Sequence, residues 1–527
     1  MHPVETVLTL LVLTTLLALF ARKLGAVPTP ITMVVGGGLI AFVPGLPHVT
    51  LDPQIVFLLF LPPLLYAAAY FTSRRDFKHN LTSISLLAIG LVLATTAAVG
   101  YTLHYFVPSI PLTLCFLLGA IVSPPDAVAA SAIAHRMHLP RPIVSILEGE
   151  SLVNDATGLV LYKLALAAVL SGAHVTFASA SLDFLKLAAG GLVLGTALGF
   201  LFVRIQRFFE DPVLATTASL LISFGTYIVA EHLHLSGVLA VVAAGLVQGR
   251  CFPLIGTSEI RLHATNVWRT VIFLLEALAF VLIGLQLPEV VTALREYPTA
   301  LIVKAALAAT GAAILVRLVW MFPGAYLPRF LFPRFRKTHP YPPATWVLIT
   351  GWSGMRGVVS LAAALALPLT LPSGEPFPAR SLLIFLTFCV ILGTLVIQGG
   401  TLPLLIRLLE VADDGSLQEE QKEARLALTE AALVRVDTVA EEKMLGGHQV
   451  HPVRNELMLR LRALTRVEAV STPASKDARM TLLLKREAIE AQRTELARMR
   501  RSETIGDETF HALQQELDID EMRLRRG

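Results

Sequence analysis

Long apolar runs separated by short polar stretches fill residues 1–410. Each run is about as long as a helix that crosses a hydrocarbon core of roughly 30 Å, so the pattern predicts membrane-spanning helices. We expect about thirteen spans, at residues 4–21, 29–44, 53–72, 82–107, 112–135, 143–171, 183–207, 213–231, 234–250, 263–286, 297–323, 341–370 and 380–409.

The pattern changes beyond residue 410, where charged segments carry apolar residues at every third or fourth position. The stretches 417–445 and 480–501 show it most clearly, and it is typical of amphipathic helices in water. We therefore expect residues 411–527 to form a helical tail, either simply solvated or with a regulatory or dimer-contact role.

Composition agrees with a membrane protein. Apolar residues make up 54% of the 527 residues, and only 16% are charged, against roughly 25% in soluble domains. We find no nucleophile–base pair, metal cluster or cofactor loop, which argues against an enzyme and against a bound cofactor.

Basic residues distinguish the two sides of the predicted membrane domain. Loops after even-numbered spans contain only Lys186, Arg295 and Arg380. Loops after odd-numbered spans hold many more: Arg22, Lys23, Arg74, Arg75, Lys78, Arg136, Arg141, Arg204, Arg207, Arg250, Arg261, Arg269, Arg329, Arg334, Arg336 and Lys337. The positive-inside rule then predicts an external N-terminus and a cytoplasmic C-terminus, which requires an odd number of spans.

The fifth predicted span is interrupted by the stretch 123-SPPDAVAA-130. Pro124 and Pro125 remove two backbone donors, and a broken helix inside a membrane is tolerated where it lines a cavity or is buried in protein. Asp126 follows the break roughly 21 Å into the span, near mid-depth. A carboxylate beside freed carbonyls suits a cation site, although a kinked helix with a structurally paired aspartate is the alternative.

The sixth predicted span contains 148-EGESLVNDATGLVLYK-163. Ser151 and Asp155 share one helix face, and Glu150 and Asn154 share the adjacent face. These oxygen atoms suit a small hard cation, and no Cys or His lies nearby to favour a soft metal. Glu148 lies nearer the basic side, where we expect it to be solvated or to attract cations at an entrance.

The twelfth predicted span contains 351-GWSGMRGVVS-360, in which three glycines surround Arg356. A buried arginine requires a carboxylate partner, and we expect that partner to be Glu150. Asp126 and Asp155 would then remain as the unbalanced charges. Glu276 in the tenth span either lines a cavity or is a protonated structural residue.

The two interrupted spans are seven apart, so they run in opposite directions. Paired broken helices in inverted halves indicate the binding site of a secondary transporter. We find no phosphate-binding loop for ATP and no potassium-channel filter sequence. The sequence therefore predicts transport driven by an ion gradient.

The segments SPPDAVAA, EGESLVNDATGLVLY, SGVLAVVAAGLVQG, LEALAFVLIGLQL and GWSGMRGVVSLAAAL together resemble the monovalent cation:proton antiporter-1 family. The resemblance covers essentially residues 1–410. It implies an all-α fold of thirteen spans in inverted repeats, acting as a homodimer in the cell (inner) membrane. A core within 82–171 and 297–409 would move against a dimerising scaffold within 4–72 and 183–286.

The resemblance also implies roles for individual residues. Asn154 and Asp155 mark the electroneutral exchanger type, and Asp155 is the expected carrier of Na⁺ and protons. Asp126 and the Ser151 hydroxyl complete the expected Na⁺ site, and the family's buried ion pair maps to Glu150 and Arg356.

Two positions depart from the family pattern. Ala67 stands in the third span where many relatives carry an acid, and Ala127 follows Asp126 where relatives often have proline. These departures leave open whether Na⁺, K⁺ or another monovalent cation is exchanged. A cation channel or a membrane sensor is the alternative of another class.

Overall fold

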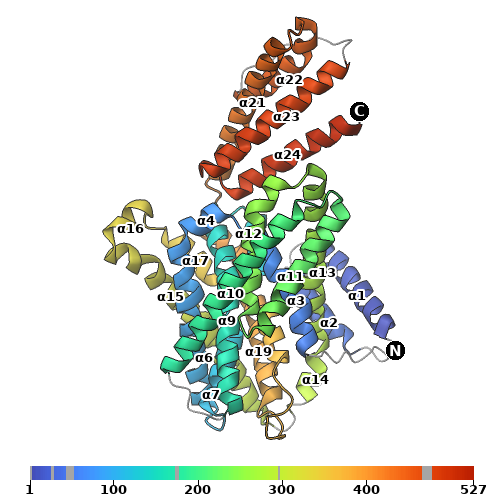
Figure 1. Cartoon of the computed structure of the whole chain (residues 1–527). Coiled ribbons are helices and arrows are strands. Elements are labelled where there is room, and N and C mark those ends of the chain that lie inside the picture. The colour runs from blue at the N-terminus through green and yellow to red at the C-terminus, as the bar shows by residue number, and fades with distance from the viewer. Residues whose placement is uncertain are drawn as a thin grey trace.

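The computed structural model describes residues 3–24, 29–42, 53–171, 177–292, 294, 297–465 and 478–526. Its regular structure is helical throughout these residues, apart from one isolated bridge between Thr370 and Pro376. Figure 1 shows a membrane-type bundle with the C-terminal helices standing on one of its ends, which we call the tail side.

Helices occupy all thirteen predicted ranges. The bundle consists of α1 (Pro3–Leu24), α2 (Thr29–Ile40), α3 (Pro53–Phe71), α4 (Arg74–His79), α5 (Leu81–Ser85), the π-helix η1 (Leu86–Leu91), α6 (Val92–Phe106), α7 (Leu112–Val122), α8 (Ala127–Arg136), α9 (Arg141–Ser171), α10 (Phe177–Gln206), α11 (Pro212–His232), α12 (Gly237–Ile255), α13 (Ser258–Leu285), α14 (Leu287–Thr292), α15 (Thr299–Leu331), α16 (Pro333–Thr338), α17 (Ala344–Trp352), α18 (Val358–Leu365), α19 (Arg380–Thr394), η2 (Leu395–Gly399) and α20 (Gly400–Leu408).

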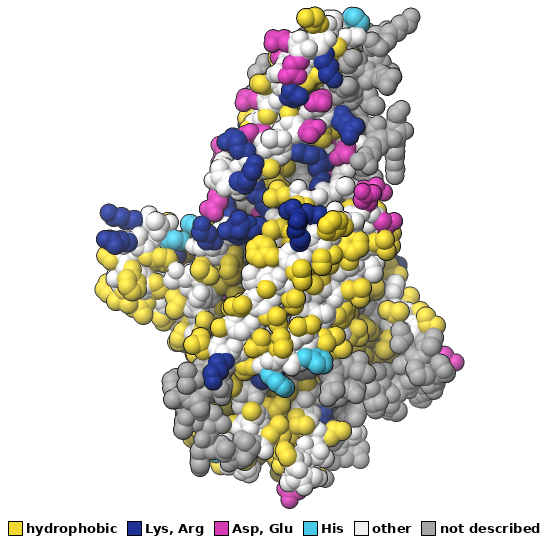
Figure 2. Space-filling model, viewed as in Figure 1, with side chains coloured by type: hydrophobic (Ala, Val, Ile, Leu, Met, Phe, Trp, Pro, Cys, Tyr) yellow, Lys and Arg dark blue, Asp and Glu magenta, His cyan; other side chains and the backbone are white. Residues whose placement is uncertain are grey.

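Within the described residues, eight helical segments are long and apolar enough to cross a membrane, and four shorter apolar helices accompany them. The number of thirteen crossings itself stays a prediction. Figure 2 shows a broad band of hydrophobic side chains across the visible face of the bundle, with Lys and Arg gathered where the bundle meets the tail. This distribution is typical of a multi-pass membrane protein.

Local sequence signals explain where several helices begin. The Asp211 carboxylate accepts hydrogen bonds from the amides of Val213 and Leu214, and Pro212 occupies the first turn of α11. The Thr257 hydroxyl accepts from the Ile260 amide at the start of α13. These side chains satisfy amide groups that have no partner inside the helix.

The bundle helices pack mostly within two groups. The core group comprises α5–α9, η1, α15, α17–α20 and η2. The scaffold group comprises α1–α3 and α10–α13. The core group meets the scaffold group mainly where α9 and α18 pack on α3, α10, α12 and α13.

The tail is formed by α21 (Ser416–Glu442), α22 (Gly447–Thr465), α23 (Ala478–Arg501) and α24 (Asp507–Arg526). The helices α21 and α23 lie where the two amphipathic stretches were predicted. Two small apolar clusters hold the tail together, one around Phe510 and the other around Val436. The helix α24 also packs against α13 of the scaffold group.

Candidate functional site

Two interrupted helices cross inside the core group. The chain between α7 and α8 (residues 123–126) meets the chain between α17 and α18 (residues 353–357). The amide of Asp126 donates to the Met355 carbonyl at 2.7 Å, and Nε of Arg356 donates to the Val122 carbonyl at 2.9 Å. Each break therefore satisfies backbone groups that the other break leaves free, as buried backbone requires.

The side chain of Asp126 lies directly against the second break. A Cβ atom built on Gly357 would fall 1.6 Å from Oδ2 of Asp126, so only glycine fits at this position. The carboxylate therefore sits at the crossing itself. The sequence predicts a carboxylate beside interrupted backbone, and the structure places Asp126 there; its role in a cation site stays a prediction.

The helix α9 brings Asp155 to the same crossing. Asp155 is buried, and Asp126 and Glu150 are the charged groups that act on it electrostatically. Gly158, one turn further on, packs against Pro124 of the first break, where an added Cβ would lie 3.0 Å from the ring. Two carboxylates of like charge thus share a buried region, which is favourable only when a cation or a proton compensates them.

Asn154 is completely buried beside Asp155. Neither its side-chain nitrogen nor its side-chain oxygen has a hydrogen-bond partner. Buried amides are rarely left without partners, so Asn154 is a buried polar position whose hydrogen bonds the surrounding side chains and backbone do not supply. Ser151 lies one turn before Asp155 on α9 and is partly buried.

The predicted ion pair between Glu150 and Arg356 is wrong. Glu150 pairs instead with Arg317 of α15, whose two terminal nitrogens lie 2.5 and 2.9 Å from the two carboxylate oxygens. Both side chains are fully buried. Because this fork occupies both oxygens of Glu150, Arg317 supplies the charge that Arg356 was expected to supply.

Arg356 binds backbone carbonyls. Besides the Val122 carbonyl at the end of α7, it contacts the carbonyls of Gly354 and Ala313. A cation is favourable at the C-terminal end of a helix, where carbonyls carry partial negative charge. Arg356 therefore stabilises the crossing of the two breaks.

Arg317 was not predicted from the sequence. Its signal was present, because it is an arginine inside the apolar run 299–331. Arg356, within the glycine-rich stretch of the predicted twelfth span, is the partner that the sequence favours for Glu150, and only the packing of α15 against α17 reveals the second arginine. Nε of Arg317 donates to the Gly351 carbonyl at 3.1 Å, which ties the pair to the end of α17.

The two accessory glutamates lie apart from one another. Glu276 of α13 is partly buried in the scaffold group, and Asp126 is the charged group that acts on it. Glu148 lies 3.4 Å from His135. It lines a cavity of about 670 Å³ on the tail side, between the core group, the scaffold group and α24.

An ion pair joins the two groups at the opposite end. Lys163 of α9 contacts both carboxylate oxygens of Glu231 of α11, at 2.6 and 2.8 Å. Lys163 lies roughly 33 Å further along α9 than Arg141, which is on the tail side. This pair was not predicted from the sequence.

Two carboxylates, Asp126 and Asp155, lie where the interrupted helices cross in the core group. Secondary transporters use this arrangement of broken helices for ions, so the fold and the crossing are of the secondary-transporter type. No group of three or more His, Cys, Asp or Glu that could hold a metal occurs in the described part of the chain.

Comparison with known proteins agrees. Residues 8–408 match the family model described as sodium/hydrogen exchanger, transmembrane. An uncharacterized Na⁺/H⁺ exchanger of Escherichia coli, YjcE, is 33% identical over 94% of this chain and 93% of its own length. A sodium, potassium, lithium and rubidium/H⁺ antiporter of Bacillus pumilus is 37% identical over 76% of this chain and 61% of its own.

The fold is also similar to a solved structure. The sodium proton antiporter MjNhaP1 from Methanocaldococcus jannaschii superimposes with a TM-score of 0.61 at 20% identity, over 78% of this chain and all of that protein. The chain belongs to the sodium/hydrogen exchanger family. Exchange of a monovalent cation for protons across a membrane is therefore its class of activity.

Proposed function

We propose that the protein exchanges one Na⁺ for one proton, for control of pH and sodium, with Asp155 as the shared carrier. The observation that carries this proposal is the burial of Asp155 at the crossing of the two broken helices, beside the Asp126 carboxylate. Asp155, Asp126 and the Ser151 hydroxyl supply the hard oxygen ligands that Na⁺ requires.

The coupling follows from competition. Asp155 holds a proton or a cation but not both, and either one neutralises it. A bare buried carboxylate costs several kcal/mol, so the empty carrier cannot cross between the two sides. Asn154 keeps the adjacent position uncharged, which limits the exchange to one charge for one charge.

The core group would move against the scaffold group to expose Asp155 to alternate sides. In this structure the cavity near Glu148 lies on the tail side, and the pair of Lys163 with Glu231 joins the groups on the opposite side. We therefore propose that this conformation is open toward the tail. Glu148 would attract cations at that entrance, and Glu276 would line the scaffold side of the path.

The proposed orientation places the tail in the cytoplasm and the N-terminus outside, in the inner membrane of a cell. The gathering of Lys and Arg where the bundle meets the tail supports it (Figure 2). We further propose a homodimer in which the scaffold groups meet, as the family resemblance implies.

The test uses purified full-length protein in liposomes with an imposed pH gradient. Addition of Na⁺ should move protons in the wild type and in Asp437→Asn, a matched change in an exposed tail residue. Asp155→Asn should abolish the movement. Proton movement that survives in Asp155→Asn would transfer the carrier role to Asp126 or Glu276.

The second candidate is exchange of K⁺ for protons. The Bacillus pumilus relative is named as a sodium, potassium, lithium and rubidium/H⁺ antiporter, which supports this second candidate. Adding K⁺, Li⁺ and Na⁺ in turn in the same liposomes ranks the cations. A cation flux without proton movement would indicate a channel instead.

A further inference from the structure

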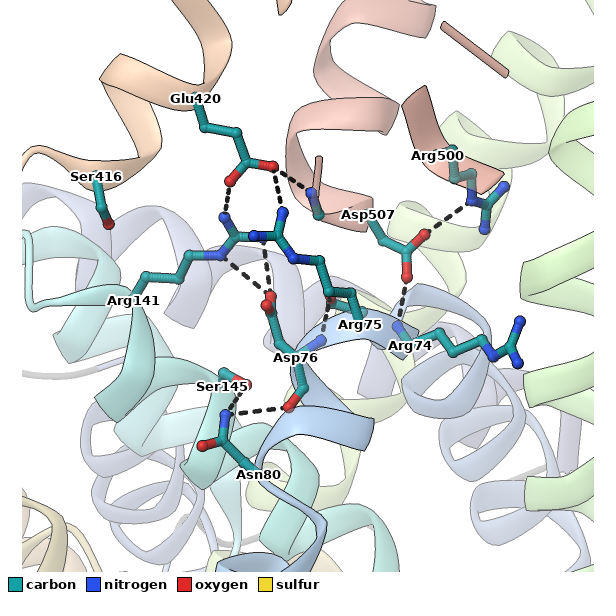
Figure 3. Close-up of polar contacts among 12 residues, drawn as sticks. Arg74, Arg75, Asp76, Asn80, Arg141, Ser145, Ser416, Glu420, Arg500 and Asp507 are labelled. Carbon is teal, nitrogen blue, oxygen red and sulfur yellow. Dashed lines mark hydrogen bonds and ion pairs between the residues drawn. The ribbon is translucent and has the colours of Figure 1, made fainter. Parts of the chain in front are cut away.

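The tail is tied by ion pairs, most of them partly or fully buried, to the tail-side ends of both bundle groups. Glu420 of α21 binds Arg75 of α4 at 3.0 Å and also contacts Arg141 of α9. Arg141 in turn binds Asp76 of α4 at 2.9 Å. Figure 3 shows these side chains converging between the tail and α4 and α9. We call this set, Arg75, Asp76, Arg141 and Glu420, the core anchor.

A second set of contacts ties the tail to the scaffold group. Asp518 of α24 binds Arg261 of α13 through two bonds of 2.5 and 3.1 Å, and the Asp518 side chain is 3% exposed. Gln514 donates to the Pro253 carbonyl of α12 at 2.6 Å. We call Arg261, Gln514 and Asp518 the scaffold anchor.

The two anchors belong to one folded unit. Asp507 at the start of α24 accepts from the backbone amide of Arg74 in α4 and from Nε of Arg500 at 2.9 Å. Arg500 also donates to the Gly249 carbonyl of α12 at 3.2 Å. The Glu420 carboxylate further accepts from the Gly506 amide, so α21 and α24 are joined next to the core anchor.

The tail also covers the cavity between the two groups. Its lining includes Glu508, His511 and Gln515 of α24, opposite Glu148 of α9 and Arg269 of α13. A change in the distance between the core and scaffold groups on this side must therefore stretch or break one of the anchors.

We propose that the tail is a clamp that holds the core and scaffold groups together at their tail-side ends and thereby limits the exchange rate. This proposal rests on the proposed exchange by relative movement of the two groups. Arginine–carboxylate forks are strong and directional contacts. The pairs of Arg141 with Glu420 and of Arg261 with Asp518 are largely shielded from solvent, so salt screens them less than exposed pairs.

A clamp makes a specific prediction about combined changes, because opening either end frees the movement, and at the scaffold end this includes the contacts of Gln514 and Arg500 with α12. Glu420→Gln at the core anchor and Asp518→Asn at the scaffold anchor should each raise the maximal Na⁺-driven proton flux by roughly fivefold or more, in the range of coupling that linked sites usually show. The double variant should be no faster than either single variant. Independent stabilising contacts would give additive effects instead.

The measurement uses the full-length chain in liposomes, with Glu456→Gln as the matched control. Among the described residues, the ion pairs of Glu456 are with Arg460 and Lys485, both in the tail. Deuterium uptake at residues 416–423 and 507–518 reports whether an anchor has opened. Arg261→Lys keeps the charge and loses the fork. Arg261→Lys should therefore release the scaffold anchor more mildly and raise the rate less. It replaces Asp518→Asn in the test if that variant does not fold.

An unchanged or lower rate in variants whose anchors have opened would overturn the clamp, and so would additive rates in the double variant. Failure of the exchange proposal is distinguishable, because the wild type itself would then move no protons on addition of Na⁺.

Discussion

The buried pair of Glu150 and Arg317 allows a quantitative test of the structure. Both side chains are at most 1% exposed, and the guanidinium fork contacts both carboxylate oxygens. Removing one partner of such a pair leaves an uncompensated buried charge, which costs about 3–5 kcal/mol. We expect Arg317→Met and Glu150→Met each to lower the free energy of unfolding by about this amount.

The double variant should recover most of the loss. Two methionines fill a similar volume without charge, and replacing a complete buried pair in this way is often nearly neutral. The lost bonds from Arg317 to the carbonyls of Thr350 and Gly351 leave a residual cost of about 1–2 kcal/mol. The coupling energy between positions 150 and 317 should therefore be about 3 kcal/mol or more.

The assay is reversible unfolding in mixed detergent micelles, followed by tryptophan fluorescence. The exposed tail pair of Asp437 and Arg454, at 3.1 Å, serves as the comparison and should couple by about 0.2–1 kcal/mol. A Glu150–Arg356 coupling larger than the Glu150–Arg317 coupling would refute this assignment of the pair.

Three further predictions follow from single contacts. Gly357→Ala should reduce exchange about tenfold or more, because the added Cβ displaces the Asp126 carboxylate. Gly311→Ala, whose added Cβ would meet open space, should leave exchange unchanged. Equal exchange rates in the two variants would refute the role of the crossing. Lys163→Gln should increase deuterium uptake at the far ends of α9 and α11, and unchanged uptake would show that the Glu231 pair does not close that side. His511 has its pKa lowered from 6.5 to about 4 by burial and by Arg500 and Arg261, with Asp507 opposing them. The neutral form of the His511 imidazole therefore stabilises the docked tail, fully so above pH about 6.5. Protection of α24 from deuterium exchange should be lost as the pH falls from there toward 4. His511→Gln should flatten this loss, and an identical profile in that variant would exclude His511 as its cause.

Much of this molecule could be predicted from the order of its residues. Apolar runs located the helices, and Pro124 and Pro125 located the first break, because a missing amide donor interrupts a helix wherever it lies. The polar residues of α9 were identified because oxygen-rich side chains are rare inside apolar runs. The second break at residues 353–357 was likewise visible from its glycines.

Pairing could not be predicted in the same way. Arg317 and Arg356 are both isolated arginines in apolar spans, and neither spacing nor composition says which one reaches Glu150. The choice depends on tertiary packing, which brings the Arg317 fork onto both carboxylate oxygens of Glu150 and turns Arg356 toward the Val122 carbonyl at the end of α7.

The sequence by itself therefore determined the local properties of this protein: which segments are helical and apolar, where two helices break, and which carboxylates lie within apolar segments. Only the tertiary structure decided the contacts between distant segments. It brought Asp126 against Gly357, paired Glu150 with Arg317, and tied Glu420 and Asp518 to the two bundle groups. The physical reason is that helix formation depends on neighbouring residues, whereas a salt bridge depends on which helix faces meet.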